Sequence, residues 1–281
     1  MANAMTKMLG RAGSLARRVR GQDQTPVPLE ELEPPEVLSE AVSGGDFRSV
    51  GREFADHLIR LGGLRPDDRV LDIGCGTGRI AVPLLDYLGA GSYEGFDVHP
   101  EGIRWCEANL TSRNTAFRFR SVPVQSGWFN PWGKEPASDF TFPYADGEFD
   151  LAFAVSLFTH LLPPATERYL SELARVLRPG GRWLATFFLI AADGQPPPSP
   201  EWLAPPGWPP PVRFQRQLDH CRILDPDNPE RAVAHQEDWL RAAIERAGLS
   251  VRATHRGYWP GRHGLSYQDI LLGDRDPNHG A

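Results

Sequence analysis

The sequence predicts an α/β fold in which a doubly wound, mainly parallel sheet carries helices on both faces. Two observations lead to this prediction. An apolar stretch at residues 69–73 runs into three glycines at alternate positions and then into a helical apolar pattern. Further along, short apolar runs of strand length alternate with segments of helical periodicity as far as residue 272. In such sheets, a glycine turn from strand to helix is where nucleotide-like ligands bind.

The glycine turn distinguishes between two kinds of ligand. Gly74, Gly76 and Gly78 follow the pattern G-x-G-x-G, and Arg79 stands where the dinucleotide pattern G-x-G-x-x-G has its third glycine. Asp72 lies inside the end of the strand, two residues before the first glycine. A carboxylate there suits a cationic ligand and repels a pyrophosphate, so the turn favours a ligand other than a dinucleotide.

Two helices flank this strand in the prediction. Asp46 can cap a helix that Gly62 and Gly63 end. After the glycine turn, the apolar spacing predicts a second helix over residues 80–88, kinked by Pro83 because proline removes one backbone hydrogen bond.

Residues 70–78, V-L-D-I-G-C-G-T-G, resemble motif I of the class I S-adenosylmethionine-dependent methyltransferases. The segments F-P-x-x-D-G-x-F-D at 142–150 and L-A-R-V-L-R-P-G-G at 173–181 resemble the same family. The resemblance covers roughly residues 46–272, and shorter segments look like a bacterial branch whose methyl acceptors are unassigned. It implies a seven-stranded Rossmann-like sheet of order 3-2-1-4-5-7-6 with the last strand antiparallel.

The resemblance also implies S-adenosylmethionine as cofactor. A second strand, at residues 93–97, ends in Asp97 about twenty residues after the turn, where a carboxylate can accept both ribose hydroxyls. The cofactor residues expected from the resemblance are Asp72, Gly74, Cys75, Gly76, Gly78, Asp97, Val98 and Ser156. The family usually has an acid near adenine after the third strand, at residues 117–120, but here Pro123 occupies that position. Gln125, Ser126 or a backbone carbonyl are the alternatives for the adenine contact.

The methyl acceptor is expected beyond the fourth strand. His160 follows that strand at the carboxyl edge of the sheet, and a neutral imidazole there can take a proton from an acceptor hydroxyl. The alternative is a histidine that only positions its loop. Acceptor contacts are expected from Thr159, Trp128, Tyr258 and Trp259, with packing as the alternative role for the last two. The aromatic stretch 126–142 is either a wall of the cleft or packing under a long loop.

The remaining elements complete the expected sheet. A helix begins at Pro164, the fifth strand covers 182–189, a helix covers 237–247 and a final hairpin pairs 249–254 with 265–272. A proline-rich insertion, 191–235, precedes that last helix and is interpreted as a cap over the acceptor site, with a surface excursion as the alternative.

The termini lie outside this domain in the prediction, which assigns residues 46–275 to it and 276–281 to a tail. Residues 1–45 combine a basic amphipathic segment, 1–20, with an acidic proline-rich linker, 21–40. The basic segment has the pattern of a helix on an anionic membrane surface, so weak membrane contact is one hypothesis and a frayed tail is the other.

Composition limits the functional classes. A net charge of −6 argues against a nucleic-acid partner. The three cysteines are scattered, so we expect neither disulfides nor a metal site, and a reducing cytoplasm. We also expect no secretory signal in residues 1–20. The predicted function is SN2 methyl transfer to a hydroxyl of a small molecule or glycan. A non-catalytic methyltransferase-like scaffold, or an NAD-dependent oxidoreductase or epimerase, are the alternatives.

Overall fold

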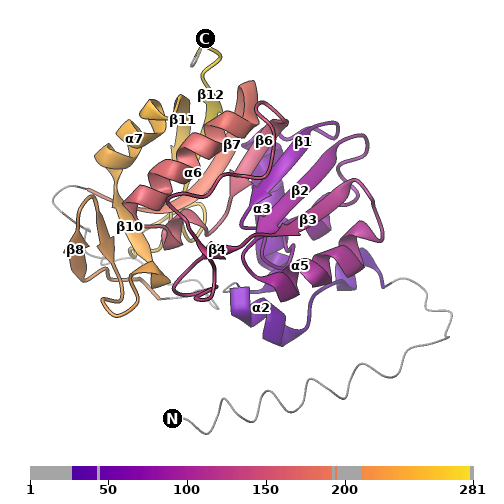
Figure 1. Cartoon of the computed structure of the whole chain (residues 1–281), viewed down its shortest axis with the longest axis horizontal. Coiled ribbons are helices and arrows are strands. Elements are labelled where there is room, and N and C mark those ends of the chain that lie inside the picture. The colour runs from indigo at the N-terminus through magenta and orange to yellow at the C-terminus, as the bar shows by residue number, and fades with distance from the viewer. Residues whose placement is uncertain (1–26, 43–44, 192–193, 195–209, 279–281) are drawn as a thin grey trace, which may run out of the picture. The chain divides into compact units, whose positions relative to one another are not determined.

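The computed structural model describes residues 27–42, 45–191, 194 and 210–278 (Figure 1). Contacts divide the chain into two compact units, Met1–Leu32 and Glu33–Ala281. The described part of the first unit contains one 3-10 turn, η1 (Leu29–Glu31). The expected amphipathic helix at 1–20 and the tryptophans of the insertion, Trp202 and Trp208, lie outside the described residues.

The second unit is built on one sheet whose central strands are parallel. These strands are β1 (Arg69–Ile73), β2 (Ser92–Asp97), β3 (Phe117–Ser121), β6 (Phe149–Ala154) and β7 (Leu177–Ile190). Beyond β7 come β12 (Asp269–Arg275) and β11 (Leu249–His255), each antiparallel to its neighbour. The order β3-β2-β1-β6-β7-β12-β11 confirms the expected 3-2-1-4-5-7-6 arrangement.

Helices cover both faces of this sheet, and Figure 1 shows α6 and α7 in front of it and α3 behind it. The helices of the domain are α3 (Phe47–Arg60), α4 (Ala81–Leu84), α5 (Pro100–Cys106), α6 (Pro163–Val176) and α7 (Glu237–Arg246). A π-helical turn, η2 (Glu107–Thr111), continues α5. The largest apolar core lies between the sheet and the pair α6 and α7. Burial on both faces explains why the central strands β1 and β6 are mostly apolar, whereas the edge strand β3 exposes Arg118 and Arg120.

The helix before β1 forms as the sequence predicts. Asp46 stands at the N-cap of α3, and its carboxylate accepts a hydrogen bond from the backbone N–H of Ser49 at 2.8 Å. At the other end, the N–H groups of Leu61 and Gly62 both donate to the carbonyl of His57, and Gly63 adopts φ +67°. The apolar face of α3 is thereby fixed against the core.

The helix after the glycine turn is shorter than predicted. Instead of a kinked helix over 80–88, α4 is a single turn, Ala81–Leu84. Pro83 is the third residue of this turn and has no N–H to donate to the carbonyl of Arg79. That carbonyl faces Gly51 of α3, where a Cβ would lie only 2.2 Å from the oxygen. Gly51 therefore lets α3 approach the backbone just before α4.

The acidic segment before α3 is also different from the prediction. Residues 21–40 were expected as an extended linker, but α2 (Glu36–Val42) is helical. The carbonyl of Pro35 accepts hydrogen bonds from the N–H groups of Leu38 and Ser39. Proline suits the first turn of a helix, since the N–H that it lacks would have no partner there.

The insertion extends the sheet from a fork in β7. Residues 182–187 of β7 pair with β12, whereas residues 188–190 pair in parallel with β10 (Val233–Gln236). Beyond β10 in the sheet lie two short strands, each antiparallel to its neighbour. In sequence they come before β10, and a 3-10 turn lies between them and β10. These elements are β8 (Arg216–Leu218), β9 (Cys221–Ile223) and η4 (Pro229–Arg231).

A buried carboxylate stabilises the fork. Asp269 is fully buried and accepts from the N–H of Leu189 at 3.0 Å, which replaces the sheet bond that β12 no longer makes there. Gly257 N, Trp259 Nε1 and Arg262 Nη2 donate to the same carboxylate at 2.9, 2.7 and 2.7 Å. With four donors, this buried charge is compensated. Within the described part of the chain, the helices are all too short or too polar to cross a membrane.

Candidate functional site

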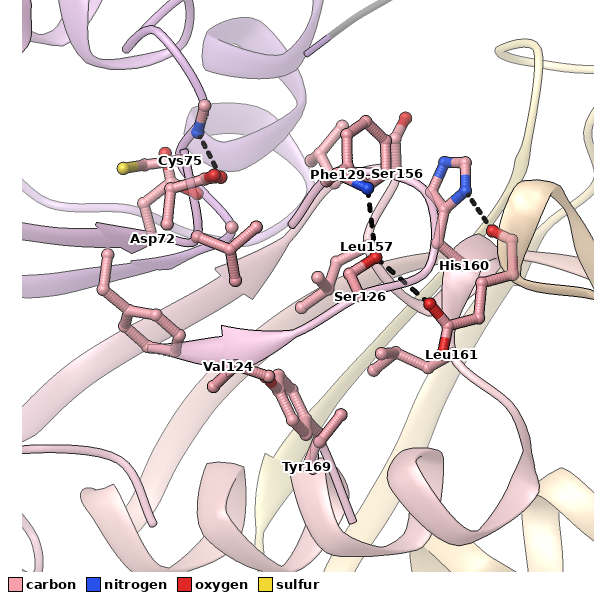
Figure 2. Close-up of a pocket in the computed structure, with 18 of the residues that line it drawn as sticks. Asp72, Cys75, Val124, Ser126, Phe129, Ser156, Leu157, His160, Leu161 and Tyr169 are labelled. Carbon is pink, nitrogen blue, oxygen red and sulfur yellow. Dashed lines mark hydrogen bonds between the residues drawn. The ribbon is translucent and has the colours of Figure 1, made fainter. Parts of the chain in front are cut away.

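A cavity opens at the carboxyl ends of β1, β2 and β6, with an empty volume of about 990 Å³ including its mouth (Figure 2). A parallel sheet binds its ligands at this edge. Seven of the eight expected cofactor residues line it, as does His160: Asp72, Gly74, Cys75, Gly76, Asp97, Val98 and Ser156.

The glycine turn forms the floor of the cavity. The N–H groups of Gly74 and Cys75 both donate to the carbonyl of Phe96 at the end of β2, at 2.9 and 3.0 Å. Gly74 has φ +80° and Gly76 has φ +54°, values that glycine adopts without strain. The backbone can therefore turn sharply and leave space above β1.

The third glycine has a packing role. Gly78 is not among the residues that line the cavity. A Cβ on Gly78 would lie 2.8 Å from Leu110 Cδ1 and 3.0 Å from Cys106 Sγ. The missing side chain of Gly78 thus lets α5 and η2 pack closely against the turn, and its contact with the cofactor stays a prediction.

Asp97 ends β2 and joins the turn to the following helix. Its Oδ2 accepts from the N–H of Gly76 at 2.8 Å and its Oδ1 accepts from the N–H of His99 at 2.9 Å. Burial raises the pKa of this carboxyl above its usual value, against the lowering effect of these bonds. Each carboxylate oxygen keeps a second lone pair, so the group can still accept hydroxyls of a sugar.

Asp72 and Arg79 place opposite charges at one end of the cavity. Asp72 accepts a short hydrogen bond from the hydroxyl of Tyr93, and burial raises its pKa to about 7. Arg79 is partly buried, and this burial lowers its pKa to about 10. A guanidinium with that pKa is charged at neutral pH, so this end presents one cation and one carboxyl group. Sequence reasoning used Arg79 only to exclude a dinucleotide and missed it as a lining residue.

Ser156 is held in an unusual conformation at the end of β6. Its φ is +59°, which is rare for a residue other than glycine. Two bonds hold it there: its N–H donates to Thr186 Oγ1 at 2.7 Å, and its Oγ donates to Gln268 Oε1 at 3.2 Å. Strained residues of this kind cluster at functional sites.

His160 ends the 3-10 turn η3 (Phe158–His160) and lines the cavity. Its Nδ1 lies 2.9 Å from the carbonyl oxygen of Glu230. Because a carbonyl only accepts, Nδ1 carries the proton and Nε2 keeps its lone pair. Burial lowers the pKa of His160 below its usual value, so the ring is neutral at pH 7. The imidazole therefore has the tautomer that a general base needs.

The aromatic stretch 126–142 divides between two roles. Gln125, Ser126 and Phe129 line the cavity, whereas Phe140 and Phe142 are in the core. The carbonyl of Pro123 accepts from the N–H groups of residues 134 and 135. Gln125 and Ser126 line the cavity and remain candidates for the adenine contact.

Four residues predicted to contact the acceptor are outside the cavity lining. Thr159 is the middle residue of η3 and is fully buried, whereas its neighbour His160 lines the cavity. Trp259 is fully buried and donates to Asp269, and Tyr258 packs against the ring of Tyr267 at 5.4 Å. Trp128 is half exposed, with the guanidinium of Arg231 5.6 Å from its ring centroid. The structure does not bring these four residues to the cavity lining, so their contact with the acceptor stays a prediction.

Glu230 lines the cavity and was not predicted. It lies in η4 of the insertion, 70 residues from His160 in sequence, and no local motif surrounds it. Only the pairing of β10 with β7 brings it to the site, so the sequence contains no signal for it.

Comparisons with known proteins agree with this geometry. Residues 70–181 match the family model described as "Methyltransferase domain". An O-methyltransferase of Aspergillus nomiae is 31% identical over 154 residues, which are 54% of this chain and 58% of the relative. The chain thus spans about half the length of the curated relatives that it matches.

Solved structures share the fold at low identity. A putative sarcosine dimethylglycine methyltransferase from Galdieria sulphuraria superposes with a TM-score of 0.53 at 13% identity, over 82% of this chain and 87% of the other. The [4+2]-cyclase SpnF gives a TM-score of 0.53 at 17% identity, over 83% and 84%. Residues 70–181 thus match a methyltransferase domain, and the strand order around them is that of the Rossmann-like methyltransferase fold.

Proposed function

We propose that this chain is an S-adenosylmethionine-dependent methyltransferase that acts on a hydroxyl of a small molecule or glycan, with His160 as general base. The observation that carries the proposal is the single cavity in which Asp72, Arg79, Asp97 and His160 meet. Each of these groups complements a different part of the reactants.

The polar groups of the cavity fit the cofactor along its length. Asp97 is at the end of β2 and suits the ribose hydroxyls. Asp72 and Arg79 suit the ammonium and carboxylate of the amino-acid tail, because the tail is a zwitterion and the cavity offers one group of each sign. Gln125 and Ser126 are available for adenine in place of the acid that Pro123 replaces.

S-adenosylmethionine bound there would supply an electrophilic methyl group. The acceptor oxygen would attack the methyl carbon in line, and S-adenosylhomocysteine would leave with the electron pair of the broken carbon–sulfur bond. The protein mainly has to position two reactants, which is a large source of rate. His160 Nε2 takes the proton of the acceptor hydroxyl as the oxygen attacks. The Glu230 carbonyl keeps Nδ1 protonated, so Nε2 remains the basic atom throughout.

The same charges count against binding of a dinucleotide. Asp72 and Asp97 both border the glycine turn, where a pyrophosphate would need donors and no nearby carboxylates. Isothermal titration calorimetry with S-adenosylmethionine, S-adenosylhomocysteine and NAD tests this directly. We expect the first two to bind and NAD not to bind; NAD binding alone would instead favour the oxidoreductase.

The activity itself is tested by an acceptor screen with methyl-labelled cofactor. Label transfer to a hydroxyl compound, lost in His160→Ala, is the expected result. Binding of S-adenosylhomocysteine without transfer to acceptors of any class would favour the non-catalytic scaffold. Because the relatives match over only about half of their length, the acceptor has to be found by experiment on this chain.

A further inference from the structure

One residue of the insertion contacts the site at two separate points. The main-chain carbonyl of Glu230 accepts from His160 Nδ1 at 2.9 Å. The side-chain Oε2 of the same residue accepts from the N–H of Gly127 at 2.5 Å and from the hydroxyl of Ser126 at 3.1 Å. Glu230 therefore joins the proposed base to residues 126–130, which we call the aromatic loop.

The aromatic loop in turn contacts His160 through Phe129. Ser126 Oγ accepts from the N–H of Phe129 at 3.3 Å, which sets the turn of the loop. The ring of Phe129 then stands edge-on to the ring of His160, with centroids 5.0 Å apart and planes at 86°. Figure 2 shows this series of hydrogen bonds and the two rings along one side of the cavity. Glu230, the aromatic loop and His160 thus each contact the other two.

A second contact strengthens this attachment. The guanidinium of Arg231 lies 5.6 Å from the ring centroid of Trp128, in the same loop. Arg231 also pairs with Asp225 at 3.3 Å, within the insertion. Consecutive residues of η4 thus attach to consecutive parts of the aromatic loop, with the charged hydrogen bonds of Glu230 as the stronger link.

We propose that Glu230 is a positioning residue that fastens the aromatic loop to the insertion and so holds Phe129 and His160 in the arrangement needed for methyl transfer. The inference rests on the proposed function and deepens it, because it assigns to the insertion a direct part in the chemistry. Glu230 acts through His160 and the loop, and the cofactor contacts at Asp72, Asp97 and the glycine turn do not depend on it.

Three variants test this role. Glu230→Ala removes the carboxylate, and Glu230→Gln keeps an oxygen that can accept from Gly127 and Ser126. Asp227→Ala is the matched control, since it removes an exposed acid three residues earlier in the same segment. The measurements are kcat and KM for the acceptor, the Kd of S-adenosylhomocysteine, and the pH profile of kcat/KM.

We expect Glu230→Ala to lower kcat about 10- to 100-fold, with the Kd of S-adenosylhomocysteine within about threefold. The acid limb of the pH profile should move to higher pH, because a released loop lets water reach His160 and reduces the burial that lowers its pKa. Glu230→Gln should stay within about fivefold of the unmodified protein, and Asp227→Ala within twofold. An unchanged kcat and acid limb in Glu230→Ala would overturn the proposal. If that variant does not fold, Ser126→Ala removes the hydroxyl that bonds both Glu230 Oε2 and the N–H of Phe129, and it should lower kcat about three- to tenfold. The Kd of S-adenosylhomocysteine, measured for the same variant, separates this effect from loss of an adenine contact; an unchanged kcat would again overturn the proposal.

A spectroscopic arm separates this inference from the proposed activity. The other titratable groups around the cavity are Asp72, Cys75, Arg79, Asp97 and Tyr169, so His160 is followed directly by NMR of labelled histidine. In Glu230→Ala we expect loss of the contact between the Phe129 and His160 rings and a higher His160 pKa. Retention of both would overturn the positioning role even if an acceptor is never found. Failure of the unmodified protein to bind S-adenosylhomocysteine would overturn the proposed function instead, while the NMR result would still decide the role of Glu230.

Discussion

His160 and His235 make the same kind of hydrogen bond and yet occupy opposite environments. His160 Nδ1 donates to the Glu230 carbonyl, and His235 Nε2 donates to the Phe158 carbonyl at 3.0 Å. His160 borders the cavity, whereas His235 is fully buried in β10 and stacks on Trp239 at 5.7 Å. Within the described part of the chain, His235 Nδ1 has no hydrogen-bond partner. Both histidines fix the turn η3, but only one of them keeps a basic nitrogen beside a ligand site.

The comparison shows that access, and not residue type, separates a base from a structural histidine. Burial lowers the pKa of both rings, for His235 to about 4. The lone pair of His235 Nδ1 faces only protein atoms, so it cannot take a proton from a substrate. We therefore assign His235 a structural role. The following predictions test that division, from the largest expected effect to the smallest.

Removing the proposed base should have the largest effect. His160→Ala and His160→Asn should each lower kcat about 10²- to 10⁴-fold, because general base catalysis is lost. The Asn variant can keep a donor toward the Glu230 carbonyl and so separates catalysis from loop anchoring. Binding of S-adenosylhomocysteine should change less than threefold in calorimetry. Turnover within threefold of the unmodified protein would show that His160 is not the base.

Removing the buried histidine should affect stability instead. His235→Ala leaves a cavity and removes the donor to the Phe158 carbonyl, so the free energy of unfolding should fall by about 2–4 kcal/mol. Urea denaturation measures this change. Turnover of the folded variant should remain within about tenfold. The division fails if stability is unchanged while turnover is lost.

The unmodified protein and a variant without His235 should also differ in how their stability depends on pH. His235 has a folded-state pKa of about 4 and an unfolded-state pKa of about 6.5, so between these values only the unfolded chain binds the proton. Stability should therefore fall as the pH drops through this window, by an amount on the order of 3 kcal/mol from this group. His235→Gln keeps a donor and does not titrate, so its stability should fall less over the same window. Equal pH dependence in both proteins would contradict the buried, neutral state of His235.

A smaller effect is expected from a second pair, the carboxylates Asp72 and Asp269. Asp269 has four donors, whereas Asp72 borders the cavity with a pKa of about 7. The cofactor's ammonium favours the ionised form of Asp72, so affinity should rise by up to about tenfold per pH unit below pH 7 and level off above it. Calorimetry in buffers of different ionisation enthalpy should detect proton release on binding at pH 6. In Asp72→Asn this release should disappear; its persistence would assign the proton to another group.

The cofactor half of the site could be predicted because its residues follow one another closely in sequence. The strand β1, the glycine turn and Asp97 at the end of β2 are set by local pattern, and the sheet order follows once the turn is identified. Gly78 shows the limit of that reasoning, since its motif position did not reveal that its missing Cβ makes room for η2.

The acceptor half could not be predicted in the same way, because long-range pairing brings it together. Glu230 reaches His160 only through the fork of β7, and Trp259 is drawn away from the site by its bond to Asp269. Pro83 is a different case: the sequence shows the proline, but it does not show that the helix is a single turn or that the Arg79 carbonyl before it faces Gly51. Local propensity was overridden by tertiary contacts at each of these positions.

The fork of β7 has an evolutionary consequence. The described part of the insertion joins the sheet through three residues of backbone pairing, Phe188–Ile190 against Ala234–Gln236. Its length can therefore change while the strands β1, β2 and β6, which border the cavity, keep their neighbours. A different insertion could then serve a different acceptor, provided that it supplies its own contact to His160, as Glu230 does here.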